Sequence, residues 1–417
     1  MYMKKINVRF LKKSLSVLVA VSTLTTMLPS FSASAAGNLA YSVGCNYSYG
    51  QHDDIDTSRD ALKSCDYYAL AGYTSRYSCN PSTTKLQQSF HGTKLMESDI
   101  IMLSGHGNAG GIYFNSEGQG GIYEFWVTNN QSANGCIIVQ NYNMNNVKLF
   151  IFDGCETAAG NTNVARTVVN RGAKAGLGWT VSVGVDCMYE WKNKFNNCIA
   201  LGYTIQAAIN YANSFNYGDN TCKNYRLYGN GDLVLKHASS SSASELMTQM
   251  NDTATVKRPA TKLRYDLIED KTAIENVLKN TFSNYAFADL QLDVARQDGG
   301  RATVTAIEKV GEYCTDNAYV LFYEDGKITE IFDRTSSDNA LSVQKAEQPF
   351  SVVSETDRQA AFASAAQKID QTRFTISDQR ARAFYERETG RRYYMVYTTV
   401  ESSHGTHSVF SSRFDLG

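Results

Sequence analysis

The stretch Ile100-Ile101-Met102-Leu103-Ser104-Gly105-His106-Gly107 decides the fold that we expect, together with Leu149-Phe150-Ile151-Phe152-Asp153-Gly154-Cys155-Glu156. Each stretch is a short apolar run that stops close to a glycine. Such runs are typical of buried strands in a parallel sheet. Residues just beyond the carboxyl end of a parallel strand face the crevice in which ligands bind. We therefore expect His106 and Cys155 to lie side by side at one edge of a sheet.

The surrounding sequence, residues 38–236, alternates between expected strands and helices. Helices are predicted at 57–72, 163–171, 188–199 and 204–214, and further strands at 39–43, 175–183 and 232–236. The Gly-rich and aromatic stretch 110–142 is predicted to form short antiparallel strands. This alternation predicts an α/β fold with a mostly parallel sheet and helices on both faces.

A change of composition marks the end of this domain. Residues 238–262 begin with a run of Ser and Ala, which is typical of a flexible linker, and Lys257-Arg258 is the basic site in it that we expect to be accessible to cleavage. Residues 263–417 combine expected helices with strands and form a separate α+β domain. His404 and His407 fall in a predicted loop of this domain, where we interpret them as solvated, and the domain shows no catalytic constellation.

The first 36 residues have the pattern of a secretory signal peptide. Five cationic residues precede a mostly apolar stretch from Leu15 to Leu28, and Ser32-Ala33-Ser34-Ala35-Ala36 supplies the small residues that a signal peptidase requires. A transmembrane span is less favoured, because the apolar stretch is short and interrupted by serine and threonine. The expected domains are thus a leader at 1–36, an α/β domain at 37–237, the linker at 238–262 and the α+β domain at 263–417, in a secreted, extracellular protein with no membrane span.

Charge and cysteine usage limit the classes of partner and cofactor. Removal of the leader leaves 35 basic against 41 acidic residues, a net charge of −6, which argues against nucleic acid as a partner. The nine cysteines contain no CxxC pair and no histidine lies near them in sequence, so we expect no structural zinc site and no cofactor. If Cys155 stays free, the other eight allow 105 disulfide connectivities, among which the sequence does not choose.

His106 and Cys155 together suggest nucleophilic catalysis. They lie 49 positions apart with the histidine first, and a neighbouring imidazole lowers the pKa of a thiol by stabilising the thiolate. The backbone N–H groups of Gly107 and Cys155 are candidates to hold the oxyanion that forms during acyl transfer. Taken singly, each side chain has a structural alternative: a buried core cysteine, and a histidine bonded to turn backbone.

The motifs around these two residues resemble those of clan CD cysteine peptidases. Leu-Ser-Gly-His-Gly at 103–107 and Phe-Asp-Gly-Cys-Glu-Thr-Ala at 152–158 are similar to the histidine and cysteine motifs of CHAT-domain, metacaspase and clostripain-like members. The opening 43–50 is similar to the first strand of metacaspases. The resemblance covers roughly residues 39 to 236 and implies the caspase-like fold, found in bacterial members among others, and endopeptidase activity on a protein or peptide substrate.

The resemblance also implies a substrate preference. In the family, an acid two positions before the nucleophile lines the primary pocket (S1) of members that cut after Arg or Lys, and Asp153 stands there. Its alternative role is to cap a turn. Asp60 is similar to a second pocket acid of metacaspases, but an exposed position on the surface of its helix is the favoured interpretation. Asp186 is a further candidate wall of the pocket, with no motif to support it.

Some clan CD peptidases require calcium, and the acidic stretch His52-Asp53-Asp54-Ile55-Asp56 is the candidate for binding it. It lacks the ligand periodicity and the glycine of an EF-hand loop, so we interpret it as a solvated loop.

The overall prediction is a secreted cysteine endopeptidase whose C-terminal domain contacts substrate, a partner or the cell envelope. The alternatives are a secreted binding or scaffold protein with a degenerate, inactive caspase-like domain, and an adhesion protein whose C-terminal domain carries the function.

Overall fold

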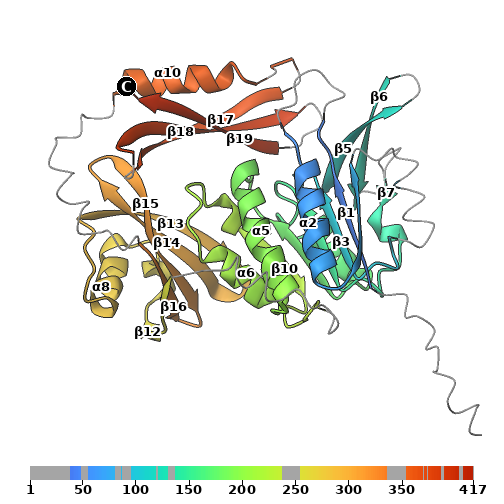
Figure 1. The fold of residues 1–417 in the computed structure, drawn as a ribbon, viewed down its shortest axis with the longest axis horizontal. Helices are drawn as coiled ribbons and strands as arrows, with labels where there is room; N and C mark the ends of the chain where they lie inside the picture. The colour runs from blue at the N-terminus through green and yellow to red at the C-terminus, as the bar shows by residue number, and fades with distance from the viewer. Residues whose placement is uncertain are drawn as a thin grey trace, which may run out of the picture.

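The computed structural model in Figure 1 describes most of the chain beyond the expected leader. The described residues are 38–47, 55–79, 86, 95–118, 121–129, 137–236, 254–335, 354–369, 371–372, 374–386, 389–402 and 407–416. The expected leader 1–36, Asp53, Asp54 and His404 lie outside them. Within the described part of the chain, no helix combines the length and the apolar character that a membrane crossing requires.

The first domain contains a six-stranded sheet in which only one edge strand is antiparallel. Its spatial order is β10-β9-β8-β3-β1-β2, and all neighbours run parallel except β10. The strands are β1 (Leu39–Gly44), β2 (Thr74–Cys79), β3 (Ile100–Ser104), β8 (Leu149–Asp153), β9 (Ala175–Trp179) and β10 (Tyr225–Gly229). The predicted mostly parallel sheet is confirmed.

Helices cover both faces of this sheet because the side chains of each buried strand alternate between two cores. Ile100 and Met102 face the core under α2 (Ser58–Leu70), α5 (Val185–Leu201) and α6 (Ile205–Asn213). Ile101 and Leu103 face the opposite core, which includes α4 (Val164–Asn170). Strand β8 shows the same alternation, so Asp153, two residues beyond Ile151, leaves the sheet on the α5 side.

A second, larger sheet joins the two halves of the molecule. Its N-terminal part holds β4 (His106–Asn108), β5 (Gly111–Gly118), β6 (Gly121–Thr128) and β7 (Ile137–Ile138), followed by the short helix η1 (Val139–Asn141). Strands β4, β5 and β6 pair antiparallel, as the Gly-rich sequence predicts. The sheet then continues into the C-terminal half of the chain.

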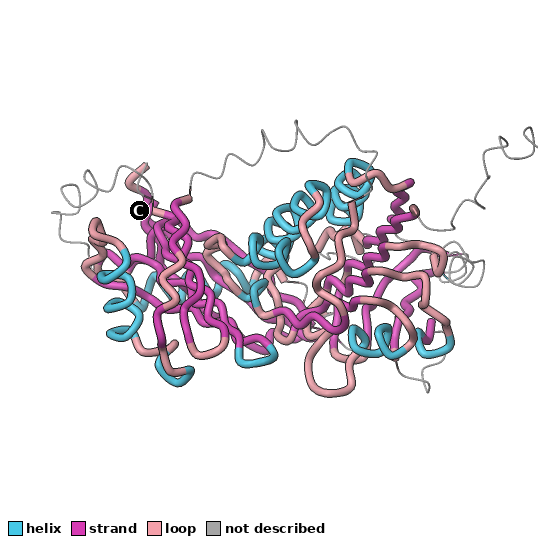
Figure 2. The backbone as a smooth tube through the Cα atoms, turned by 90° about the horizontal axis from the view of Figure 1, so that it is seen from below, coloured by secondary structure: helices cyan, strands magenta, loops and turns pink. Residues whose placement is uncertain are grey.

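The C-terminal half is rich in strands, and Figure 2 shows it beside the half with most of the helices. Its helices are η3 (Tyr265–Leu267), α8 (Lys271–Thr281), η4 (Asp298–Gly300) and α10 (Glu355–Ala366). Its strands are β11 (Thr255–Lys257), β12 (Thr261–Lys262), β13 (Asp289–Gln297), β14 (Arg301–Val310), β15 (Tyr313–Glu324), β16 (Lys327–Arg334), β17 (Phe374–Glu386), β18 (Arg391–Ser402) and β19 (His407–Leu416). The α+β character predicted for this half is confirmed.

Three local predictions are wrong. The linker does not extend to residue 262, because residues 255–257 and 261–262 form β11 and β12, which pair with β16. Lys257 is therefore part of a sheet, and Arg258 forms an ion pair with Glu330. Residues 232–236 are not a sheet strand, since the edge position beside β9 is taken by β10. His407 lies in β19 and not in a loop.

Candidate active site

The ends of two adjacent parallel strands form the centre of the site. Strands β3 and β8 pair up to Ser104 opposite Asp153, and the Gly105 N–H donates a hydrogen bond to the Asp153 carbonyl at 3.1 Å. A Cβ atom built on Gly107 would lie 2.7 Å from the Cys155 carbonyl oxygen. Only glycine permits so close an approach. The backbone segments that carry the candidate dyad residues thus lie against each other.

The Cys155 thiol is buried, with 5% of the residue exposed, and bonds to a neighbouring loop. The Val183 N–H donates to Sγ at 3.2 Å, and the thiol lies 3.7 Å from the Val183 carbonyl oxygen. Burial raises the pKa of Cys155 to about 12, although the Val183 N–H acts in the opposite direction. The next residue, Glu156, adopts a left-handed backbone with φ 59°, which marks a sharp turn directly after the thiol.

Ser408 and Tyr47 hold the imidazole of His106. Nδ1 forms a hydrogen bond with the hydroxyl of Ser408 from β19. The Tyr47 ring packs edge-on at 4.5 Å between centroids, and its hydroxyl accepts the His106 N–H at 2.7 Å. The same hydroxyl donates to the Tyr113 carbonyl oxygen at 2.6 Å. Tyr47 therefore fixes both the backbone and the ring of His106.

A buried group of charged side chains lies at the same cavity as the thiol. The Lys192 ammonium from α5 pairs with Asp60 at 2.8 Å and also with Asp153, and all three side chains are almost fully buried. The Ser104 hydroxyl bonds to both carboxylates. Asp60 is therefore buried in the site and does not lie on the exposed surface of its helix.

Burial and the neighbouring charges shift the pKa values of Asp60 and Lys192. Burial raises the pKa of Asp60 to about 6, against the attraction of Lys192 and with the repulsion of Asp153. Burial would lower the pKa of Lys192, but the two nearby carboxylates outweigh it and the pKa is raised. One ammonium thus faces two carboxylates. One oxygen of each, Oδ1 of Asp60 and of Asp153, is buried without a hydrogen-bond partner among the described residues.

A narrow cavity connects the thiol with this charged group. It has a volume of about 30 Å³, which holds on the order of one or two water molecules. Cys155, Asp60, Asp153, Gly154 and Ser408 are among the residues that line it. Asp186 is not one of them. It lies at the exposed start of α5, pairs with Arg59 at 3.1 Å and borders a neighbouring groove.

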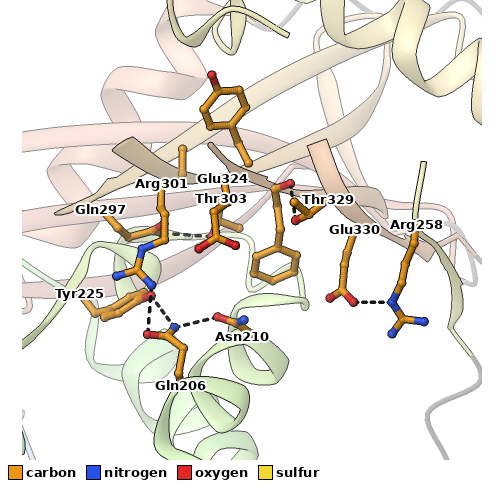
Figure 3. Close-up of a pocket in the computed structure, with 13 residues that line it drawn as sticks. Gln206, Asn210, Tyr225, Arg258, Gln297, Arg301, Thr303, Glu324, Thr329 and Glu330 are labelled. Atoms are coloured by element: carbon orange, nitrogen blue, oxygen red, sulfur yellow. Dashed lines mark hydrogen bonds and ion pairs between the residues drawn. The ribbon is translucent and has the colours of Figure 1, made fainter. Parts of the chain in front are cut away.

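A larger polar pocket of about 390 Å³ lies between α6 and the C-terminal sheet (Figure 3). Arg301 donates to Gln206 of α6 at 3.2 Å across the pocket, and Arg258 pairs with the neighbouring Glu330 at 2.7 Å at one side of it. Its described lining includes no cysteine and no histidine. Of these two pockets, only the smaller cavity is lined by a cysteine.

Cysteines and acidic residues also lie elsewhere in the described part of the chain. Eight cysteines are described, and no disulfide joins any two of them; Cys136 lies outside the described residues. No group of three or more His, Cys, Asp or Glu side chains among the described residues is arranged to hold a metal ion. His52, Asp53 and Asp54 of the acidic stretch, which we interpret as a solvated loop, lie outside the described residues.

No family model and no curated protein matches the chain in sequence. Among solved structures, the Arg-specific cysteine proteinase gingipain R aligns over 90% of this chain and 67% of its own, with a TM-score of 0.35 and 10% identity. The C-terminal domain of Bacillus megaterium YpeB aligns over 38% of this chain and 67% of its own, with a TM-score of 0.21 and 13% identity. Scores this low assign neither family nor activity to the chain.

Three residues of the site were not predicted. Lys192 and Ser408 lie far from both motifs in sequence, and a lysine in an amphipathic helix or a serine in a strand gives no signal of its own. Tyr47 lies within the stretch that resembles the first strand of metacaspases, so its region, but not its role, was indicated.

Proposed function

We propose that the chain is a secreted cysteine endopeptidase that cleaves after Arg or Lys, with Cys155 as nucleophile and His106 as its base and acid. The observation that carries this proposal is the position of both residues just beyond the ends of adjacent parallel strands. Cys155 lines a cavity with acidic walls, and Ser408, which bonds to the His106 ring, lines the same cavity. In this reaction His106 takes the thiol proton, and the thiolate attacks the carbonyl carbon. His106 then returns the proton to the leaving amine, and water hydrolyses the thioester.

The preference for basic residues rests on the charge balance below the thiol. Asp60 and Asp153 carry two negative charges when ionised, against the single charge of Lys192. The unpaired Oδ1 atoms of both carboxylates are the acceptors that a guanidinium or ammonium group would use. A cationic side chain entering from the substrate would balance the charge and satisfy these oxygens.

A second candidate function is a binding or scaffold protein with an inactive peptidase domain. Two observations favour it: the pKa of Cys155 is raised to about 12 by burial, and the cavity is too small for an arginine side chain. A buried neutral thiol is a poor nucleophile. The two functions differ in whether the full chain can hydrolyse a peptide.

The first experiment measures hydrolysis of arginyl and lysyl peptides by wild type, Cys155→Ala and the control Cys65→Ala, which changes a half-buried thiol elsewhere. We expect only Cys155→Ala to lose activity, and activity retained in that variant refutes Cys155 as the nucleophile.

The second experiment compares Asp153→Asn with Asp66→Asn, which changes an exposed aspartate on α2. Loss of charge pairing at a buried site commonly costs 2–5 kcal/mol, so kcat/KM for arginyl peptides should fall by roughly tenfold or more in Asp153→Asn only. A wild type that prefers acidic or apolar residues refutes the specificity and leaves the nucleophile standing.

A further inference from the structure

Strand β19 lies against the strand that begins with the candidate base His106. His407 pairs with Gly107 of β4 in antiparallel register, and the adjacent Ser408 bonds to the His106 ring. The Ser408 side chain also lines the cavity that contains Cys155. The C-terminal strand therefore contacts both the candidate base and the entrance to the candidate specificity pocket.

The same strand contacts the opposite wall of the site. Val409 forms a parallel bridge with Gly184, which directly follows the Val183 backbone that holds the thiol. Ser411 donates a hydrogen bond to Asp186 at 2.6 Å. Strand β19 thus spans the site from the histidine side to the loop on the cysteine side. In Figure 1 it lies across the end of α5 towards β5.

The rest of the C-terminal half holds β19 in this position. Strand β19 pairs with β18 from His407 opposite Glu401 to Leu416 opposite Arg392. Arg382 of β17 donates to the Gly218 carbonyl at 2.8 Å, which ties the same sheet to the N-terminal domain. The strand is therefore part of a docked sheet and not a loose chain end.

An extended peptide commonly binds by adding a strand to the free edge of a sheet, with side chains entering pockets on one face. Here the edge of β4 is already paired, and Gly107, a candidate oxyanion donor, is part of that pairing. Ser408 presents a small neutral hydroxyl at the pocket, without the positive charge that the acidic walls would select.

We propose that β19 occupies the groove of the peptide substrate, so that the C-terminal half acts as a built-in competitive inhibitor of the peptidase. This inference rests on the proposed function of the same site. It accounts for the burial of Cys155 and for the small volume of the cavity as features of a closed state. Substrate cleavage then requires β19 to leave β4 and the Gly184 loop.

The test introduces a negative charge that the acidic pocket repels. In the full chain, Ser408→Glu places a carboxylate beside Asp60 and Asp153, and Ser412→Glu, four residues along the same strand, is the matched control. Iodoacetamide labelling of Cys155 is followed by peptide mapping, with the fully buried Cys198 as an internal report of global unfolding. Hydrogen exchange of residues 106–108 reports whether β19 has left β4.

We expect Ser408→Glu to raise the hydrogen-exchange rate of the β4 amides and to raise the labelling rate of Cys155 at least tenfold. The labelling rate of Cys198 should not change, and Ser412→Glu should leave all of these rates at their wild-type values. Val409→Asp, at a fully buried position on the Gly184 side, should give the same result. Unchanged Cys155 labelling in both variants overturns the proposal. If the wild type then hydrolyses peptides, only the inhibition is wrong; if no variant hydrolyses them, the proposed function fails as well.

Discussion

Replacement of Lys192 by methionine is expected to be strongly destabilising, because it removes the ammonium that pairs with two buried carboxylates. The Lys192 Nζ lies 2.8 Å from Asp60 and also contacts Asp153, and the lysine and Asp60 side chains are each only 3% exposed. Solvent therefore screens these charges little. Breaking a buried pair by removing one partner typically costs about 3–5 kcal/mol. We expect a loss of that size in the free energy of unfolding at neutral pH.

The matched control is Lys279→Met, which removes an ion pair of similar length from an exposed helix surface. Lys279 lies 3.0 Å from Glu275, and its side chain is 55% exposed. Such pairs contribute about 0.3–0.5 kcal/mol. Urea unfolding of both variants beside the wild type compares the two losses under one set of conditions. A double variant, Lys192→Met with Asp60→Asn, should recover part of the loss, because only one buried carboxylate then remains.

The pH dependence of the Lys192→Met variant gives a second check. Burial raises the pKa of Asp60 and Lys192 opposes this rise, so without the ammonium Asp60 binds its proton still more tightly in the folded chain than in the unfolded chain. Stability must then rise as the pH falls from about 7 to about 5, so the loss relative to the wild type shrinks. A loss below about 1 kcal/mol, or a loss that does not change with pH, would refute the buried charge group.

Three further predictions concern neighbouring residues. Burial raises the pKa of Asp60 to about 6, so the ratio of kcat/KM for arginyl over neutral peptides should fall as the pH drops through that value, and Asp60→Asn should remove this fall. Tyr47→Phe deletes the acceptor of the buried His106 N–H. We expect it to lower the free energy of unfolding by about 1–3 kcal/mol and also to lower kcat. Unchanged values in both assays speak against a positioning role for Tyr47. Gly107→Ala would place a Cβ 2.7 Å from the Cys155 carbonyl oxygen. We therefore expect the rate of peptide hydrolysis to fall at least tenfold, while circular dichroism shows that the secondary structure is retained. Full activity would count against the close approach of the two backbone segments.

Sequence patterns predicted those parts of the site that depend on local order. The two apolar runs fixed where β3 and β8 end, and the alternation of side chains along β8 placed Asp153 and Cys155 at the same cavity. The identity of the partners across the site could not follow from local patterns. The contact of Ser408 with His106 joins residues 302 positions apart, and it depends on how two sheets meet.

Errors arose where short polar segments have no strong periodicity. Residues 255–262 resemble the linker before them, and they become strands only because the edge of β16 is available to pair with them. The prediction that favoured an exposed Asp60 on the helix surface is wrong, because its carboxylate is buried and pairs with Lys192. Its burial depends on Lys192, which approaches from a helix more than a hundred residues later.

The central claim is that His106 activates Cys155, and one measurement tests it most directly. In the Ser408→Glu chain, whose thiol is expected to be accessible, the rate of Cys155 alkylation by iodoacetamide is measured near neutral pH with and without His106→Ala. The account predicts a rate at least tenfold lower without the imidazole, because the thiolate loses its partner. An equal rate in the two chains, with β4 shown by hydrogen exchange to be uncovered in both, would contradict it.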